Sequence, residues 1–315
     1  MQKLKLGIST CLLGEPVRYD GGHKLDRFLT DVLGRFVEYV PVCPEVECGL
    51  PVPRESMHLV GDPEAPRLIT TRSKQDLTDR MLHWAEQRLH ELEKEELSGF
   101  IFKSNSPSSG MERIKVFDSR GMPRKVGRGI FARAFMSRFP LAPVEDEGRL
   151  HDMAIRENFI ERIFAYHRWQ QLNRENRKPG NLVEFHARHK YLIMAHSSKH
   201  YSQMGRLTAH AKDIPEDELF DQYGSLLMEA LKLKATVRKN TNVLQHLAGY
   251  FKEDLSADEK LELQELIADY HSGHLPLIVP VTLLNHYTRK FGKEYLKSQF
   301  YLRPHPIELQ LRNHV

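Results

Sequence analysis

Three cysteines are the residues best suited to chemistry in this 315-residue chain, and all of them lie within its first fifty residues. Cys43 and Cys48 form a C-x4-C pair in the run PVCPEVECGLPVPR, and Cys11 lies in the run STCLLGEPVRYDGG. Prolines and a glycine predict that the pair lies in a loop, where ligands and catalytic groups are often carried. Free cysteine is also among the most buried residue types, so three unrelated core thiols are the alternative.

Thiolates are ligands of zinc and of iron–sulfur clusters. A cubane cluster is normally held by four cysteines, so a set of three leaves one metal position for water or substrate, as in a catalytic site. Glu45 lies two residues from Cys43 and three from Cys48. A carboxylate beside bound metal can activate water or carry a proton, so Glu45 is a catalytic candidate.

The elements around the cysteines alternate between strand and helix. The patterns predict strands over 4–9, 36–42 and 99–103, and helices over 26–33 and 73–96. Ser73 is the expected cap of the second helix. This order predicts a Rossmann-like α/β domain, in which a parallel sheet carries helices on both faces. Because ligands of such sheets bind beyond the carboxyl ends of the strands, the three following loops should meet in one site.

Polar side chains in these loops are candidates for substrate binding. They are Arg18, Asp20, Arg54, Lys103, Asn105, Ser106, Ser108 and Ser109. Each serine, taken alone, is more often a turn or capping residue. Residues 124–139 predict a basic loop followed by a helix with a phenylalanine-rich core face. Arg124, Lys125 and Arg128 of that loop either contact phosphate or form a solvated basic edge.

Beyond residue 148 the pattern is almost entirely helical. A helix is predicted over 150–172, and the polar run 173–181, which holds a proline and a glycine, is typical of a domain boundary. Further helices are predicted over 183–203, 216–235, 240–252, 257–270 and 280–299. We therefore expect an α/β domain over 1–172 and an all-α domain over 182–315.

The helical part holds two basic stretches, HARHKYLIMAHSSKHY and KLKATVRKNTN. Their cations include Lys190, Lys199, Lys234, Arg238 and Lys239. Neighbouring histidines and asparagines suit contacts with sugars and bases, so one interpretation is a face that binds nucleic-acid phosphates. A solvated helical face is the other interpretation.

Composition excludes some classes of protein. With 40% hydrophobic residues and no apolar run of membrane-spanning length, the chain is too polar for an integral membrane protein. The first residues lack the apolar core of a signal peptide, and three clustered cysteines argue against a disulfide framework, so we expect a cytoplasmic protein. A net charge of +4 permits a polyanionic partner without requiring one.

Five motifs together resemble the thiouracil desulfidase (TudS) family over residues 1–170. They are CLLG from Cys11, RYDG from Arg18, CPE from Cys43, CGLPVPR from Cys48 and SPSSG from Ser106. Residues 183–300 resemble the YbgA-type helical domain of unknown function, through HKYLIMAH and KATVRKNTNVLQHLAGYF. The fused arrangement is similar to that of RudS-type desulfidases, which act on 4-thiouridine in tRNA.

The resemblance implies a [4Fe-4S] cluster held by Cys11, Cys43 and Cys48, whose unique iron takes up the thiocarbonyl sulfur as a Lewis acid. Water would add to the ring carbon and hydrosulfide would leave, without a redox change. The implied substrate is thiolated uracil, with 4-thiouridine in tRNA as the main expectation. A cluster-carrying sensor without turnover, or a desulfidase of free thiobases only, are the alternatives.

Within this scheme Glu45 would transfer the proton, and Ser106 and Ser108 would position base or water. Many relatives have cysteine where this chain has Ser109, so that residue's role does not carry over. The basic residues of the helical domain would then bind the RNA.

Overall fold

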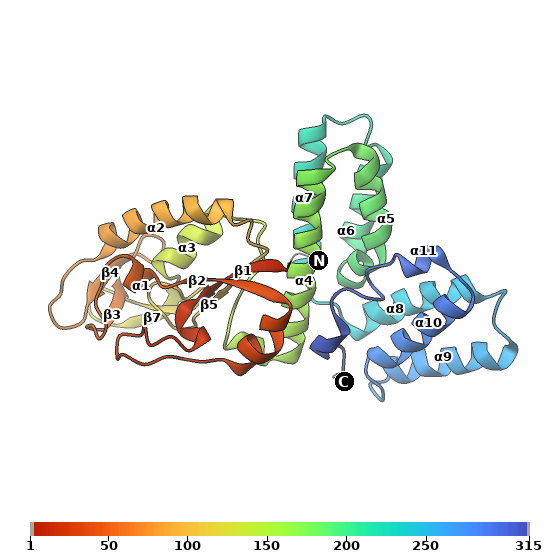
Figure 1. The fold of residues 1–315 in the computed structure, drawn as a ribbon, viewed down its shortest axis with the longest axis horizontal. Helices are drawn as coiled ribbons and strands as arrows, with labels where there is room; N and C mark the ends of the chain where they lie inside the picture. The colour runs from red at the N-terminus through yellow and green to blue at the C-terminus, as the bar shows by residue number, and fades with distance from the viewer. Residues whose placement is uncertain (1–2, 314–315) are drawn as a thin grey trace. The chain divides into compact units, whose positions relative to one another are not determined.

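The computed structural model describes residues 3–313, and the chain divides into two compact units, 1–152 and 153–315 (Figure 1). Helix α4 (Met153–Glu175), which the sequence placed at the end of the first domain, belongs to the second unit. Trp169 of this helix stacks on Phe220 and Tyr223 of α7 (Glu216–Lys232). The core of the second unit therefore includes α4, and the unit begins at Met153 rather than in the predicted linker 173–181.

The first unit is built on a four-stranded parallel sheet in the order β2-β1-β5-β8. Its strands are β1 (Leu4–Ser9), β2 (Val37–Val42), β5 (Phe100–Phe102) and β8 (Val144–Asp146). Because all four run in the same direction, their carboxyl ends lie at one edge of the sheet. The predicted parallel sheet and the convergence of its loops are confirmed.

A second sheet, in the order β4-β3-β6-β7, was not predicted. It consists of β3 (Met57–Val60), β4 (Arg67–Thr70), β6 (Ile114–Phe117) and β7 (Pro123–Gly127). The prediction of a basic loop over 124–129 is therefore wrong for most of its length, because β7 pairs with β6 in an antiparallel hairpin. Strands of four or five residues give too short a pattern to stand out from loops.

The helices of the first unit agree with the sequence in place and differ at their ends. Helix α2 (Thr78–Lys94) begins later than predicted, because Ser73 bonds to Glu55 and Thr70 instead of capping a helix. Helix α3 (Ile130–Arg138) lies beside α2 (Figure 1), and its Phe131 and Phe135 are buried as predicted. The predicted helix over 26–33 is a pair of short π and 3-10 turns between Phe28 and Arg35.

The second unit contains no strand among residues 153–313, which confirms the all-α prediction. Besides α4 and α7 its helices are α5 (Pro179–His196), α6 (Ser198–Ala209), α8 (Val237–Ala248), α9 (Ala257–His271), α10 (Ile278–Lys290) and α11 (Glu294–Lys297). The helix predicted over 183–203 breaks at Ser197, whose side chain accepts a bond from the His200 amide and so caps α6. Within the described range, no helix combines the length and apolarity needed to span a membrane.

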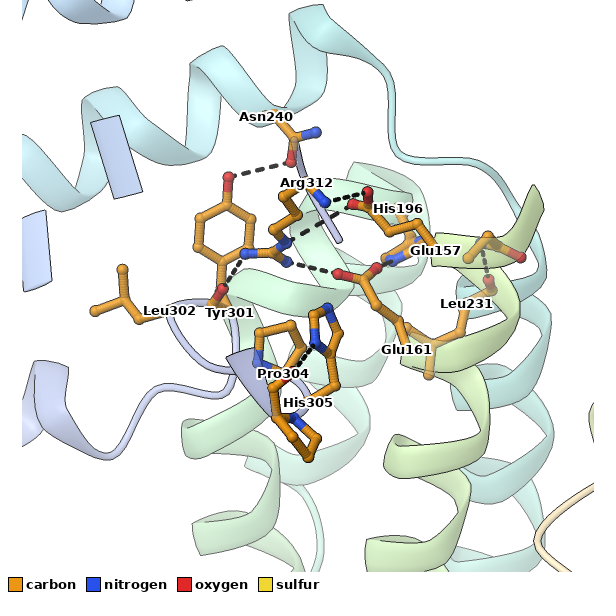
Figure 2. A network of polar contacts seen from close by, with 12 residues as sticks. Glu157, Glu161, His196, Leu231, Asn240, Tyr301, Leu302, Pro304, His305 and Arg312 are labelled. Atoms are coloured by element: carbon orange, nitrogen blue, oxygen red, sulfur yellow. Dashed lines mark hydrogen bonds and ion pairs between the residues drawn. The ribbon is translucent and has the colours of Figure 1, made fainter. Parts of the chain in front are cut away.

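A buried charge network holds the C-terminal segment onto these helices (Figure 2). Arg312 donates from Nη2 to Glu161 Oε1 at 2.6 Å and from Nη1 to the Tyr301 carbonyl at 2.7 Å. His196 Nε2 lies 3.0 Å from the other Glu161 oxygen. Burial opposes ionisation of Glu161, but Arg312 and His196 outweigh it and hold its pKa below the ordinary value. Burial and the Glu161 charge raise the pKa of Glu157 to about 7.

Candidate functional site

A cavity of about 260 Å³ lies at the carboxyl edge of the parallel sheet. Loops that follow β1, β2 and β5 form its wall, as the order of strands predicted. The predicted site residues that line it are Cys11, Arg18, Cys43, Glu45, Arg54, Lys103, Asn105, Ser106 and Ser109. Three predicted residues, Asp20, Cys48 and Ser108, do not line the cavity.

The three thiols lie around one short helix, α1 (Pro44–Glu47). Cys11 and Cys43 line the cavity, and each is only 8% exposed. Cys48 follows the last residue of α1, where its Sγ lies 3.3 Å from the Glu45 carbonyl oxygen. Its side chain packs against the apolar cluster that includes Leu77.

Burial controls the protonation of these thiols. It raises the pKa of Cys11 to about 11 and that of Cys43 to about 12, and it also raises the pKa of Cys48. Among the described residues, no group of three or more histidine, cysteine or acidic side chains is arranged to hold a metal ion. The donor set nevertheless fits an iron–sulfur cluster in its chemistry, because two soft thiols line one cavity and the third follows the short helix α1 that begins after Cys43.

Glu45 is held at the cavity wall by three different groups. Ser108 Oγ donates to its Oε1 at 2.5 Å. Its Oε2 lies 3.6 Å from Cys43 Sγ and 3.8 Å from Arg54 Nη2. The side chain is only 12% exposed, so these contacts rather than water fix its position. A carboxylate placed in this way beside the Cys43 thiol is suited to proton transfer inside the cavity.

The serine loop, residues 106–110, explains why Ser108 acts from outside the cavity. Ser108 is fully buried, and its hydroxyl lies between Glu45 and Ser106 Oγ, which is 2.9 Å away. Ser106 Oγ also accepts a bond from the Ser109 amide at 3.1 Å. Ser106 and Ser109 can therefore touch a ligand, whereas Ser108 positions the Glu45 carboxylate.

Arg54 and Arg18 form the cationic side of the cavity. Arg54 donates from Nη1 to the Val17 carbonyl at 2.9 Å, and its buried Nε has no partner among the described residues. This nitrogen is a donor left over for a ligand. Asp20 lies outside the cavity, where its carboxylate accepts the Gly22 amide at 3.1 Å and lies 3.4 Å from Arg18 Nε. Asp20 therefore holds a turn and orients Arg18.

Lys103 is tied to a residue that the sequence did not reveal. Its ammonium donates to Glu147 and to the Ser104 carbonyl, the latter at 2.9 Å. Glu147 follows β8, and its other oxygen accepts the Ser104 amide at 2.6 Å. No local motif marks Glu147, and only the pairing of β8 with β5 brings it to the site. Asn105 is exposed at the cavity rim.

The structure places the predicted nucleic-acid residues of the second unit in different environments. Lys199, Lys234 and Arg238 are exposed, and Arg238 lines an open groove of about 870 Å³ between α8 and α9. Lys190 lies over the rings of Tyr191 and Tyr295. Lys239 donates to the carbonyls of His196 and Lys234, so its charge helps to hold the end of α5.

Comparison with known proteins agrees with this division of the chain. A family model described as 2-thiouracil desulfurase matches residues 6–147, and one described as a protein of unknown function (DUF1722) matches residues 190–306. The uncharacterized protein YbgA of Escherichia coli (strain K12) is 31% identical over 153 residues, which are 48% of this chain and 90% of YbgA. The solved structure of the [4Fe-4S]-dependent thiouracil desulfidase TudS matches at 29% identity with a TM-score of 0.41, over 50% of this chain and all of that one.

The first unit is thus an α/β domain of the 2-thiouracil desulfurase type, and it is fused to a helical domain of the DUF1722 type. The chain belongs to the family of YbgA, of whose sequence it covers 90%.

Proposed function

We propose that this protein desulfurates thiolated uracil, and that its main substrate is 4-thiouridine in tRNA, which it converts to uridine. The observation that carries the proposal is the Glu45 carboxylate, which is fixed beside the Cys43 thiol at the wall of a cavity that Cys11 also lines, in a domain of the 2-thiouracil desulfurase type. At about 260 Å³ the cavity is smaller than ordinary ligand pockets of roughly 300–1,000 Å³. A polynucleotide could insert only one base, turned out of its stack.

The cofactor of this reaction would be a [4Fe-4S] cluster, which the thiolates of Cys11, Cys43 and Cys48 would hold. When bound, the cluster supplies a Lewis acid for the thiocarbonyl sulfur. Because burial keeps the free thiols protonated at neutral pH, their protons must be released when metal binds.

The residues of the chain account for the proton transfers. Glu45 takes a proton from the water whose oxygen forms the new bond to the ring carbon, and Ser108 holds that carboxylate in place. The carbon–sulfur bond then breaks while the new hydroxyl group loses its proton to the sulfur, so that a carbonyl forms and hydrosulfide leaves, and the proton on Glu45 passes to solvent. Arg54 faces the second oxygen of Glu45 and offers its free Nε to the ring.

RNA binding is assigned to the helical unit through exposed cations. Lys199, Lys234 and Arg238 are free to meet phosphates, and Lys190 adds a charge beside tyrosine rings that bases could stack on. Lys239 supports this face through its bonds to backbone carbonyls. A substrate of this kind, and the absence of a membrane-spanning helix among the described residues, suit a cytoplasmic enzyme.

Anaerobic reconstitution of the full chain tests the proposal. Incubation with 4-thiouridine, free or in tRNA, should abolish the near-ultraviolet absorbance of the thiocarbonyl. Glu45→Gln keeps the shape but removes the base, so turnover should fall by roughly 10²-fold or more while cluster content persists. Glu47→Gln on the same helix is the control, because Glu47 pairs with Arg88 outside the cavity. Unchanged absorbance with the reconstituted wild type would instead indicate a sensor that binds without turnover.

A further inference from the structure

The hairpin of β6 and β7 carries a dense set of cations in the first unit. They are Arg113, Lys115, Arg120, Arg124, Lys125 and Arg128, and all six are exposed. Within residues 3–313 no carboxylate forms an ion pair with any of them. The two nearest acids in the sequence have other partners: Glu112 pairs with Arg149 at 2.7 Å, and Asp118 accepts the amides of the hairpin turn. The hairpin therefore presents uncompensated positive charge to solvent.

Two of these cations lie directly opposite each other. The register pairs Lys115 of β6 with Lys125 of β7. Like charges at opposed positions of an antiparallel pair destabilise it, because their Cβ atoms are only about 5 Å apart. An anion between the two ammonium groups would turn this repulsion into attraction. Beside them, Met122 and Val126 are 63% and 48% exposed, so the same hairpin also offers apolar contacts to a sugar or base.

The hairpin begins shortly after the serine loop, and the residues that follow its second strand are bonded back to that loop. The Gly129 amide donates to the Gly110 carbonyl at 2.8 Å, and the Phe131 amide donates to the Ser108 carbonyl at 2.9 Å. A Cβ atom at Gly129 would lie 2.4 Å from the Ser108 carbonyl oxygen, so only glycine permits this approach. Lys115 is five residues from Gly110, which limits the distance between their Cα atoms to about 18 Å. The charged hairpin is thus held in a fixed position, and its distance from the cavity is one that a few nucleotides of RNA can span.

We propose that the β6–β7 hairpin is a binding site for the phosphate backbone of RNA, with Lys115 and Lys125 on either side of one phosphate. The proposal deepens the proposed function and rests on it, because the RNA bound here is the one that presents its thiolated base to the cavity. The hairpin would thereby give the desulfidase unit itself a preference for polynucleotide substrates over free nucleosides.

Lys125→Glu in the full chain tests the site, because it replaces a like-charge pair by an opposite-charge pair across the strands. The hairpin should keep its stability, with a Tm equal to or above that of the wild type. Affinity for tRNA should fall about fourfold at 0.15 M salt, because the phosphate between the two lysines is no longer neutralised. The log–log salt dependence should become shallower by about 0.7 to 0.9. The ratio of kcat/KM for thiolated tRNA to kcat/KM for free 4-thiouridine should fall by the same factor.

Lys94→Glu is the matched control, because Lys94 is an exposed lysine of α2 with the same change of charge. It should leave the affinity for tRNA and the salt slope as in the wild type. Lys115→Gln provides a second variant, and because Lys125 still contacts the phosphate, tRNA binding should weaken by less, about twofold at 0.15 M salt. Wild-type affinity and salt slope in both hairpin variants would overturn the proposal, and so would an equal loss in Lys94→Glu.

Unmodified tRNA serves as the binding probe, so the result does not depend on turnover. If the reconstituted protein desulfurates nothing but its tRNA affinity depends on Lys115 and Lys125, the proposed function fails and the hairpin site stands. If it desulfurates tRNA while both variants bind normally, the hairpin site fails and the proposed function stands.

Discussion

The network around Glu161 (Figure 2) allows a quantitative test of what holds the second unit together. We choose Arg312→Met, because methionine keeps much of the side chain's apolar length and removes only the guanidinium. The side chains of Arg312 and Glu161 are 4% and 3% exposed. Without its partner, Glu161 would keep only the bond to His196 inside the protein, and the Tyr301 carbonyl would lose its donor.

The expected loss is large because the remaining charge cannot reach water. Removing one partner of a buried ion pair typically costs about 3–5 kcal/mol. The whole stability of a domain is about 5–15 kcal/mol, so the second unit would lose a substantial part of it. Glu161→Gln in the same chain should recover about 1–3 kcal/mol, because an amide needs no cationic partner.

The two tryptophans of the chain make the measurement specific, since Trp84 lies in the first unit and Trp169 in the second. In a Trp84→Phe background, fluorescence during urea denaturation at pH 7 reports the second unit. Arg303→Met is the control, because this arginine is exposed and forms no ion pair with a described residue, and it should change stability by under about 0.5 kcal/mol. A loss below about 1 kcal/mol for Arg312→Met, or an equal loss in the Glu161→Gln background, would refute the reasoning.

Other variants test the remaining assignments. Serine in place of any one of Cys11, Cys43 or Cys48 should remove or destabilise the cluster, and full iron content and absorbance in all three variants would contradict the ligand set. The pKa of Glu157 is raised from 4.5 to about 7, so the folded state binds its proton more tightly and the unfolding free energy should decline as pH rises through this range. Glu157→Gln should lack that decline, and parallel stability profiles for variant and wild type would show that another group is responsible. Arg238→Gln should weaken tRNA binding without loss of stability, whereas Lys239→Gln should lower the Tm. Filter binding and thermal unfolding of both variants show which residue contacts the RNA and which one stabilises the fold.

The sequence predicted which loops meet, because chain order alone determines their position. Parallel strands have their carboxyl ends at one edge, so the loops that carry Cys11, Cys43 and Ser106 had to meet once the three strands were recognised. The cysteines and Glu45 stood out because thiols are rare in the chain and occur in loops with proline and glycine.

The sequence could not reveal contacts made by residues that are distant in the chain. Lys103 was predicted to bind substrate, and only the structure shows that Glu147 neutralises its charge. Lys239 was counted as an RNA contact, although its ammonium bonds to carbonyls of residues 196 and 234. Amphipathic pattern placed α4 correctly as a helix but could not say which core its apolar face joins. Each of these outcomes depends on tertiary packing, which local pattern does not encode.

The serine loop connects the two halves of the proposed reaction. The Ser108 hydroxyl fixes Glu45, and the Ser108 carbonyl accepts the Phe131 amide just after the hairpin. A base enters the small cavity only after it has left its stack, which costs a few kcal/mol. A phosphate bound between Lys115 and Lys125 can supply part of this energy close to the cavity, because Ser108 holds both the hairpin and the Glu45 carboxylate. Contacts with phosphate, which does not react, would then help to hold the reacting carbon beside Glu45. A free nucleoside has no such phosphate, so it would lack this stabilisation.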